Sequence, residues 1–237
     1  VEIALELHDD ELTVGVATSG EALHKRPWRV YQHRAPLAGG LASALVALSG
    51  WQGEGLLLDP CCGSGTIPIE ADHRFRRAPA NAARASWPFE RLRVFDPAAL
   101  ARVRERLLAE ARAEGAPLQG NEQYAKHLDG ARRNAEAAGV GAWATWTNRD
   151  FNHLERPEGL THVVANPPWG LRVTSRKVSD RIAAELRARL DRWAKEGPLT
   201  AIVLVGNRRF EKLAEPPAKA RDVMNGGVPC RVLRYEL

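Results

Sequence analysis

The segment Leu56–Ala71, with the sequence LLLDPCCGSGTIPIEA, joins a short apolar run to a turn that contains glycines. LLLD is typical of a buried strand of a parallel sheet, and a helix is expected from Thr66 onward. Gly63 and Gly65 carry no side chains, so a ligand can approach the backbone closely. The first turn of the helix would offer free N–H groups to a carboxylate or a phosphate. The segment therefore predicts a strand–turn–helix unit with a small-molecule site at its turn.

The chemistry of this turn narrows the choice of ligand. A Walker phosphate loop would need a lysine, and none is present here. A dinucleotide-binding turn would need a third glycine, with its acidic residue about 20 residues later. Asp59 disfavours a bare phosphate but suits a ligand with an amino group, such as S-adenosylmethionine, whose carboxylate would lie at the helix end. An ordinary strand-to-helix loop is the alternative.

Strands and helices alternate along the chain from this segment onward. THVVA (161–165) and AIVLV (201–205) are apolar runs of the kind that parallel strands form when both faces are covered. The alternation favours an open α/β sheet that binds its ligand at the carboxyl ends of the strands. We expect further helices at about residues 39–49, 97–111, 122–138 and 178–193, and a last strand in VPCRVLRYEL. The stripe formed by Leu100, Val103, Leu107 and Ala111 is interpreted as helix core.

The first 20 residues predict a β-hairpin. Apolar and polar residues alternate on both sides of an acidic turn at residues 9–11. A basic and aromatic segment follows, from Ser19 to Leu37. We therefore divide the chain into an N-terminal extension, residues 1–36, and one Rossmann-like domain, residues 37–237.

Composition bounds the class of protein. The 237 residues are 44% apolar and 27% charged, as in ordinary globular chains, and no apolar run approaches the ~20 residues of a membrane span. The formal net charge of +5 mildly favours a polyanionic partner. Three cysteines at these positions predict neither a disulfide framework nor a metal site, so we expect a cytoplasmic protein. The start at Val1 and the single methionine suggest a piece of a longer protein.

The vicinal cysteines Cys61 and Cys62 are interpreted as small packing residues. Free cysteine is often buried, and no lysine or histidine close by in the sequence would lower the pKa of either thiol. Reactive thiols are the alternative.

A second motif, Asn166-Pro167-Pro168-Trp169-Gly170, directly follows the strand THVVA. Two prolines cannot continue a ladder of hydrogen bonds, so the chain must leave the sheet in a rigid, extended form. The amide of Asn166 and the carbonyl group of Pro167 would then face one point, with an aromatic ring beside them. This arrangement suits a planar exocyclic amine whose lone pair is aligned toward an electrophilic methyl group.

Together these motifs resemble a known family. DPCCGSGT and NPPWG are similar to motifs of Rossmann-like amino-methyltransferases that use S-adenosylmethionine. SGEALHKRPWR, APLAGGLASALVALSGW, FDPAAL, ARRNAEAAGV and NGGVPCRVLRYEL extend the similarity over nearly the whole chain. The chain resembles the THUMP-associated RNA guanine-N2 methyltransferases, and its ending resembles the enzymes that act on large-subunit ribosomal RNA.

The resemblance implies a class I methyltransferase fold, with a mixed seven-stranded sheet, helices on both faces and a preceding hairpin. It also implies S-adenosylmethionine as cofactor. Asp59, Gly63 and Gly65 would hold the methionine end, Glu122 the ribose, and Asp150 with Phe151 the adenine. Glu122 stands where the family usually has aspartate. The full set of implied cofactor contacts is Ala35, Pro36, Asp59, Cys61, Gly63, Gly65, Thr66, Glu122, Asp150, Phe151 and Asn166. The implied catalytic set is Asn166, Pro167, Pro168 and Trp169.

Structured RNA is the implied substrate, with ribosomal RNA favoured over tRNA. Candidate RNA contacts are Lys25, Arg26, Trp28, Arg29, Arg208 and Arg209. A solvated basic face, or packing of the aromatic residues onto the sheet, is the alternative for these positions. The family usually carries a THUMP domain upstream, and this sequence has none. Either that domain was cut away, or this protein reaches RNA differently.

Two other functions fit the same motifs. An Asn-Pro-Pro-aromatic sequence also serves methyltransferases that act on amines of DNA or on protein glutamine. A module that keeps the fold and binds RNA without catalysis belongs to a different class.

Overall fold

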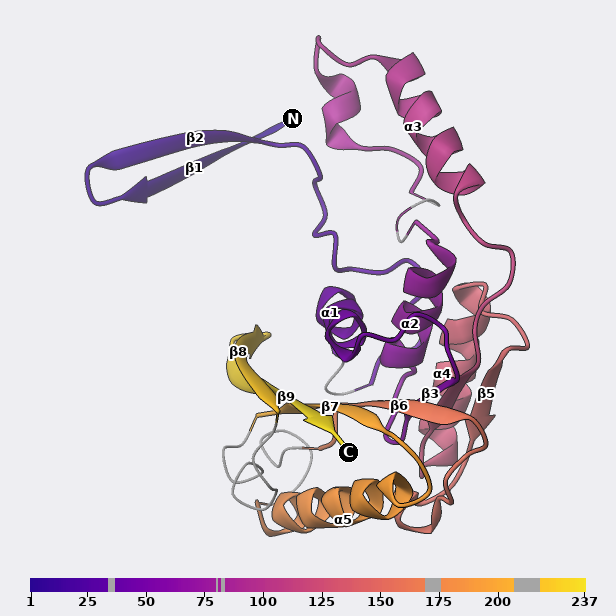
Figure 1. The fold of residues 1–237 in the computed structure, drawn as a ribbon. Helices are drawn as coiled ribbons and strands as arrows, with labels where there is room; N and C mark the ends of the chain where they lie inside the picture. Colours follow the sequence, from indigo (N-terminus) through magenta and orange to yellow (C-terminus); the bar gives the residue numbers. More distant parts are fainter. Residues whose placement is uncertain (34–36, 80, 82–83, 169–175, 207–217) are drawn as a thin grey trace.

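The protein is described from a computed structural model that defines residues 1–33, 37–79, 81, 84–168, 176–206 and 218–237. Seven strands form one mixed sheet in the order β5-β4-β3-β6-β7-β9-β8 (Figure 1). The five strands from β5 to β7 are parallel, and β9 is antiparallel to both of its neighbours. The strands are β3 (Leu56–Asp59), β4 (Leu118–Asn121), β5 (Ala144–Thr147), β6 (Leu160–Ala165), β7 (Thr200–Val205), β8 (Lys219–Asn225) and β9 (Val228–Glu236).

Helices cover both faces of this sheet, as the resemblance implied. In Figure 1, α1 and α2 lie above the sheet and α5 lies below it. The helices are α1 (Gly39–Ser49), α2 (Thr66–Arg76), α3 (Pro97–Ala109), α4 (Ala125–Ala137) and α5 (Arg176–Ala194), with short 3-10 turns η1 (Pro88–Arg91) and η2 (Phe151–His153). Strands β1 (Glu2–His8) and β2 (Glu11–Ala17) pair antiparallel in a separate hairpin. The expected fold class, including the N-terminal hairpin, is confirmed.

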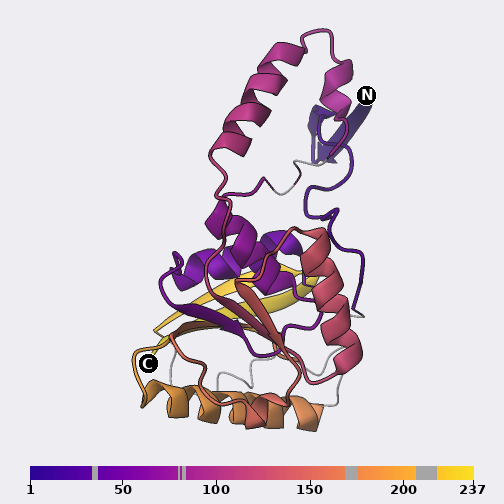
Figure 2. The ribbon, with the colours of Figure 1, turned by 90° about the vertical axis from the view of Figure 1, so that its right-hand side faces the viewer.

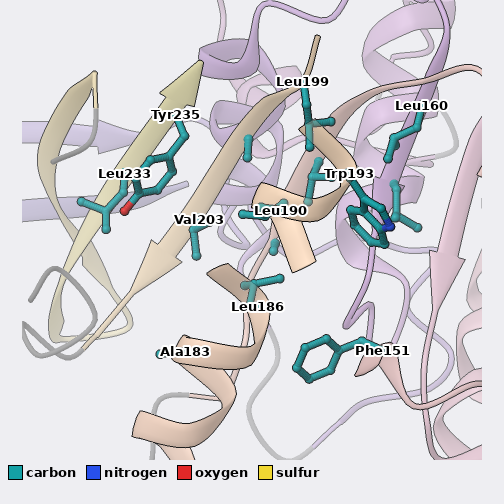
Figure 3. Packing of buried hydrophobic residues seen from close by; sticks show 14 of the residues in the cluster. Phe151, Leu160, Ala183, Leu186, Leu190, Trp193, Leu199, Val203, Leu233 and Tyr235 are labelled. Atoms are coloured by element: carbon teal, nitrogen blue, oxygen red, sulfur yellow. The ribbon is translucent and has the colours of Figure 1, made fainter. Parts of the chain in front are cut away.

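Two apolar cores follow from the alternation of side chains along the strands. On one face, the helix α5 contributes Leu186, Leu190 and Trp193, each at most 1% exposed, to a cluster with β6, β7 and β9 (Figure 3). Successive residues of β3 point to opposite faces, so Leu58 joins this cluster while Leu57 joins the cluster under α1 and α2. The central strands are therefore buried on both faces, which explains why they are continuous apolar runs.

Two parts of the chain lie outside this layered body. The β1–β2 hairpin and the segment that contains η1 and α3 both project from it (Figures 1 and 2). No residue of α3 is buried, and Val103 and Leu107 are 44% and 39% exposed. The interpretation of the stripe from Leu100 to Ala111 as helix core is therefore wrong, because α3 does not lie against the sheet.

Among the described residues, no helix combines the length and the apolar composition of a membrane span. Over the same residues, no three His, Cys, Asp or Glu side chains gather in a way that could hold a metal ion.

Candidate functional site

A cavity of about 220 Å³ lies at the carboxyl ends of β3, β4 and β6. These strands are adjacent in the sheet and parallel, so the residues that follow them meet at one edge. The lining comes from the glycine turn, the loops after β4 and β6, and the β8–β9 turn. Its residues are His33, Leu37, Asp59, Pro60, Cys61, Cys62, Gly63, Ser64, Thr66, Ile67, Glu122, Gln123, Tyr124, His127, Arg149, Phe151, Asn166, Pro167, Pro168, Ile182, Asn225 and Val228.

The glycine turn has a backbone shape that requires its glycines. Gly63 and Gly65 have φ values of 54° and 79°, in the left-handed region that favours glycine. A Cβ atom on Gly65 would lie 3.1 Å from the methyl group of Ala131 and 3.1 Å from the ring of Trp146. At Gly63 a Cβ atom would meet nothing within 4 Å, so this glycine leaves open space on the cavity side. One glycine thus allows packing of α4, and the other keeps the cavity wall thin.

The carboxylate of Glu122 joins the end of β4 to the glycine turn. Its Oε2 accepts a hydrogen bond from Gly63 N at 3.1 Å, and its Oε1 accepts one from Tyr124 N at 3.0 Å. Each carboxylate oxygen can accept a second hydrogen bond. The longer side chain of glutamate, compared with aspartate, therefore still leaves acceptor capacity toward the cavity.

The neighbouring Asn121 fixes the same region, and sequence reasoning missed it. Its Nδ2 donates to the carbonyl oxygens of Pro60 and Arg149, both at 3.0 Å, and its Oδ1 accepts from Thr147 Oγ1 at 2.9 Å. One fully buried amide therefore connects the ends of β3, β4 and β5. The sequence signal that could have identified Asn121 was its position between a glycine and the acidic residue in Gly120-Asn121-Glu122.

Burial controls the titration of the groups in the turn. Burial raises the pKa of Asp59 to about 8, the negative charge of Glu122 adds to this, and a hydrogen bond from Cys61 N at 3.0 Å opposes it. Burial, followed by the nearby carboxylates, raises the pKa of the Cys61 and Cys62 thiols well above the ordinary value. Both thiols are therefore protonated at neutral pH, which supports the packing interpretation over a nucleophile.

The Asn-Pro-Pro motif presents a hydrogen-bond acceptor that has no partner. Asn166 and both prolines line the cavity. The Oδ1 atom of Asn166 is buried and accepts no hydrogen bond within the described part of the chain. An unsatisfied buried acceptor costs about 1–3 kcal/mol, so this oxygen is available to an N–H donor that enters the cavity. Trp169 lies outside the described residues.

The remaining implied cofactor contacts differ in their position relative to the cavity. Phe151 and Thr66 are buried and line the cavity with Leu37. Asp150 is not among the lining residues, and its carboxylate accepts from Asn152 N at 3.0 Å, which caps η2. Ala35 and Pro36 lie outside the described residues.

Three side chains that the sequence did not assign to the site line the cavity: His33, Tyr124 and His127. Tyr31 Oη lies 2.6 Å from His127 Nδ1, and the rings of His33 and His127 are 4.4 Å apart. Tyr124, which is 60% exposed, packs edge-on against His127. The only signal in the sequence was the position of Tyr124 two residues after Glu122.

The structure contradicts two of the candidate RNA contacts. Trp28 is 3% exposed and packs against α2 and α4, so it cannot stack on a base. Arg26 forms two hydrogen bonds with Glu70, at 2.6 and 3.0 Å, in a nearly buried ion pair. Both residues attach the N-terminal segment to the body of the fold.

The other candidates differ in accessibility. Arg29 is half-buried and donates to the carbonyl oxygen of Leu37 at 2.9 Å. Lys25 is exposed and pairs with Glu21 at 2.8 Å. Arg208 and Arg209 lie outside the described residues.

The parallel sheet, the glycine turn and the Asn-Pro-Pro motif at one cavity together define a Rossmann-like methyltransferase fold. The chain belongs to the family described as "RMKL-like, methyltransferase domain", whose model matches residues 26–234.

Relatives and solved structures agree with this family. The chain is 35% identical over 241 residues to a tRNA (guanine(6)-N2)-methyltransferase of Archaeoglobus fulgidus, covering 99% of this chain and 57% of the relative. It is 30% identical over 247 residues to the ribosomal RNA large subunit methyltransferase K/L of Vibrio campbellii, covering all of this chain and 34% of the relative. The crystal structure of a "possible methylase" from Clostridium difficile 630 superimposes with a TM-score of 0.89 at 26% identity, covering 98% of this chain and 61% of that one. The chain thus spans only part of each of these proteins.

Proposed function

We propose that this chain transfers a methyl group from S-adenosylmethionine to the exocyclic N2 of a guanine in structured RNA. The observation that carries the proposal is the buried, unpartnered Oδ1 of Asn166 in the same cavity as Asp59 and the glycine turn. The names of the two relatives, a tRNA guanine-N2 methyltransferase and a ribosomal RNA methyltransferase, support guanine in RNA as the substrate.

The residues present fit the cofactor. The buried carboxylate of Asp59 suits an α-ammonium group, and Glu122 keeps acceptor capacity for a ribose diol. The N-terminus of α2 has no side-chain cap, so its free N–H groups suit a carboxylate. When bound, the cofactor supplies an electrophilic methyl group.

The chain's own part in the reaction is to position the amine. Asn166 Oδ1 and the Pro167 carbonyl oxygen would each accept one N–H bond of the guanine N2 amine. This holds the nitrogen lone pair toward the methyl group, so proximity and alignment provide the rate enhancement. On transfer, the bond from the methyl carbon to the cofactor's sulfur would break as the bond to N2 forms, S-adenosylhomocysteine would leave, and the amine would lose one proton to solvent. The target base must leave its stack to enter the cavity, as base-modifying enzymes require.

Methyl transfer from radiolabelled cofactor, measured on RNA, DNA and protein, tests the proposal. We expect label in RNA, and a loss of roughly 100-fold or more in rate for Asn166→Ala, comparable to removing one transition-state hydrogen bond in other enzymes. Cofactor affinity by calorimetry should stay nearly unchanged. Asn152→Ala is the matched control, because the Nδ2 atom of Asn152 binds Glu185 rather than the cavity. Label in DNA or protein only would reject RNA as substrate, and no cofactor binding would favour a non-catalytic module.

Three broader expectations also belong to the proposal. They are the division of the chain at residues 36 and 37, cytoplasmic localisation, and an upstream THUMP-type domain as the partner in RNA binding. Expression of residues 37–237 alone tests the first. A soluble, cofactor-binding fragment would support the division, and an unfolded one would move the boundary toward the N-terminus.

A further inference from the structure

The net positive charge of the chain arises from one segment. Residues 74–114, here named the arginine arm, contain ten arginines and five carboxylates. The excess of five equals the formal net charge of +5 for the whole chain. The rest of the chain has equal numbers of acidic and basic residues, 24 of each. A polyanionic partner is therefore attracted by the arm rather than by the protein as a whole.

The arm is a projecting element with its own anchors. It leaves the body at the end of α2 and returns before β4, and its helix α3 extends away from the sheet (Figure 2). At its base, Arg112 N donates to the Arg76 carbonyl oxygen at 2.7 Å, and the Arg112 guanidinium lies 4.4 Å from the centre of the Phe75 ring. Arg76 donates to the buried carboxylate of Asp72 at 2.8 Å. Two of the ten arginines thus hold the arm in place.

Aromatic rings stabilise the outer part of the arm. Trp87 and Phe89 are stacked with ring centres 5.8 Å apart, and Phe89 and Phe95 are 5.7 Å apart. Arg84 lies over the Trp87 ring at 4.2 Å. These contacts fix the turn between η1 and α3.

Other arginines of the arm are free to bind phosphates. Arg91 and Arg93 are exposed on this turn, and neither has an ion pair within 4.0 Å in the described part of the chain. Arg102 and Arg106 are about 70% exposed and form only long, solvated pairs with Asp96 and Glu110, at 3.6 and 4.0 Å. Such surface pairs contribute about 0–1 kcal/mol, so a phosphate can replace the carboxylate.

We propose that the arginine arm binds the phosphate backbone of the RNA substrate away from the target base, through Arg91 and Arg93 at the turn. The proposal rests on the proposed function, because it assumes an RNA substrate. The arm's base is separated from the cavity by α2, whose 11 residues span about 16 Å. A bound RNA must therefore extend well beyond the target nucleotide.

The test compares the double variant Arg91→Gln/Arg93→Gln with the matched control Arg192→Gln/Lys195→Gln, which removes two exposed charges on and just beyond α5. Binding of a fluorescein-labelled RNA stem–loop with guanines in its loop is measured by anisotropy at several salt concentrations. Losing two phosphate contacts should reduce the slope of log K against log salt by about 1.4–1.8, and weaken binding roughly 10- to 20-fold at 0.15 M salt. With the same RNA as substrate, KM should rise by a similar factor at unchanged kcat.

The control should bind RNA as the wild type does, and both variants should keep the wild-type cofactor affinity and melting temperature. A DNA stem–loop of the same sequence shows whether the arm distinguishes the two backbones. Equal slopes and equal KM for the arm variant and the control would overturn the proposal, as would a wild type that does not bind the RNA. If RNA is bound through the arm but never methylated, the proposed function fails while the arm proposal stands. If RNA is methylated and the arm variant behaves like the control, only the arm proposal fails.

Discussion

The raised pKa of Asp59 predicts that cofactor binding depends on pH with a defined magnitude. The carboxyl group, with a pKa of about 8 in the ligand-free protein, must ionise to pair with the α-ammonium group of the cofactor. That α-amino group also has a pKa of about 8. The binding-competent fraction is the product of the two: about 1% at pH 6, about 25% at pH 8 and about 1% at pH 10. Affinity should therefore pass through a maximum near pH 8 and fall roughly 25-fold by pH 6.

Calorimetry in two buffers of different ionisation enthalpy measures this linkage directly. Below pH 7, binding should release close to one proton, because Asp59 loses the proton that it carries in the free protein. Asp59→Asn should weaken cofactor binding at pH 8 and remove the pH dependence of the affinity between pH 6 and 7. A wild-type affinity that is flat from pH 6 to pH 8, with no proton release, would refute the pairing of Asp59 with the ammonium group.

The same shift affects the stability of the ligand-free fold. The folded state holds its Asp59 proton up to about pH 8, whereas the unfolded chain releases it near pH 3.8. Between these pH values the folded state binds more protons, so the free energy of unfolding falls as pH rises, by at most about 1.4 kcal/mol per pH unit from this group. Asp59→Asn should accordingly raise the melting temperature of the cofactor-free protein more at pH 8 than at pH 5.

Two further predictions concern the packing that positions the site. Glu70→Ala leaves the nearly buried Arg26 without its partner and should lower the free energy of unfolding by about 3–5 kcal/mol in denaturant. Lys25→Ala, which breaks an exposed ion pair, should change it by less than about 1 kcal/mol. Equal effects would contradict the structural role of the Arg26–Glu70 pair. Gly65→Ala should destabilise the protein more than Gly139→Ala. Both positions have φ of 70–79°, so either substitution costs about 1–3 kcal/mol in backbone strain. Only at position 65 would the new methyl group also meet packed atoms. Equal melting temperatures of the two variants would contradict this prediction and show that α4 shifts to accommodate the added methyl group.

The sequence predicted the strands that are continuous apolar runs and missed β4, β5 and β8, for a physical reason. Strand β4 is buried, but its mixed sequence LQGN has no apolar signature. Strands β6 and β7 are buried on both faces, so their apolar runs stand out. Strands β5 and β8 are the two edges of the sheet. β8 is mostly exposed, with the charged sequence KARDVMN, and therefore has no apolar signature. Pairing with a neighbour, rather than local composition, makes it a strand.

The candidate site shows the same division between local and long-range information. The turn residues Asp59 and Gly63 lie four positions apart in the sequence, and both line the cavity. Gly65 is not among the lining residues and instead packs against Ala131 and Trp146. Trp28 and Arg26 were misassigned because their partners lie on α2 and α4, more than 40 residues away. The apolar period of α3 predicted a helix correctly, but a period cannot show whether a surface exists to cover it.

The groups that give the site its chemistry are also those that destabilise the ligand-free fold. A carboxyl group buried beside a second carboxylate and an amide oxygen without a hydrogen bond both lie at one cavity. Each costs free energy that ordinary core packing would avoid. Each is relieved by one feature of the proposed ligands: the ammonium group pairs with Asp59, and the guanine amine donates to Asn166. The cores on both faces of the sheet supply the stability that keeps these groups in place. The apolar central strands build these cores and are also the easiest to predict from sequence, so the same strands make a strained site possible.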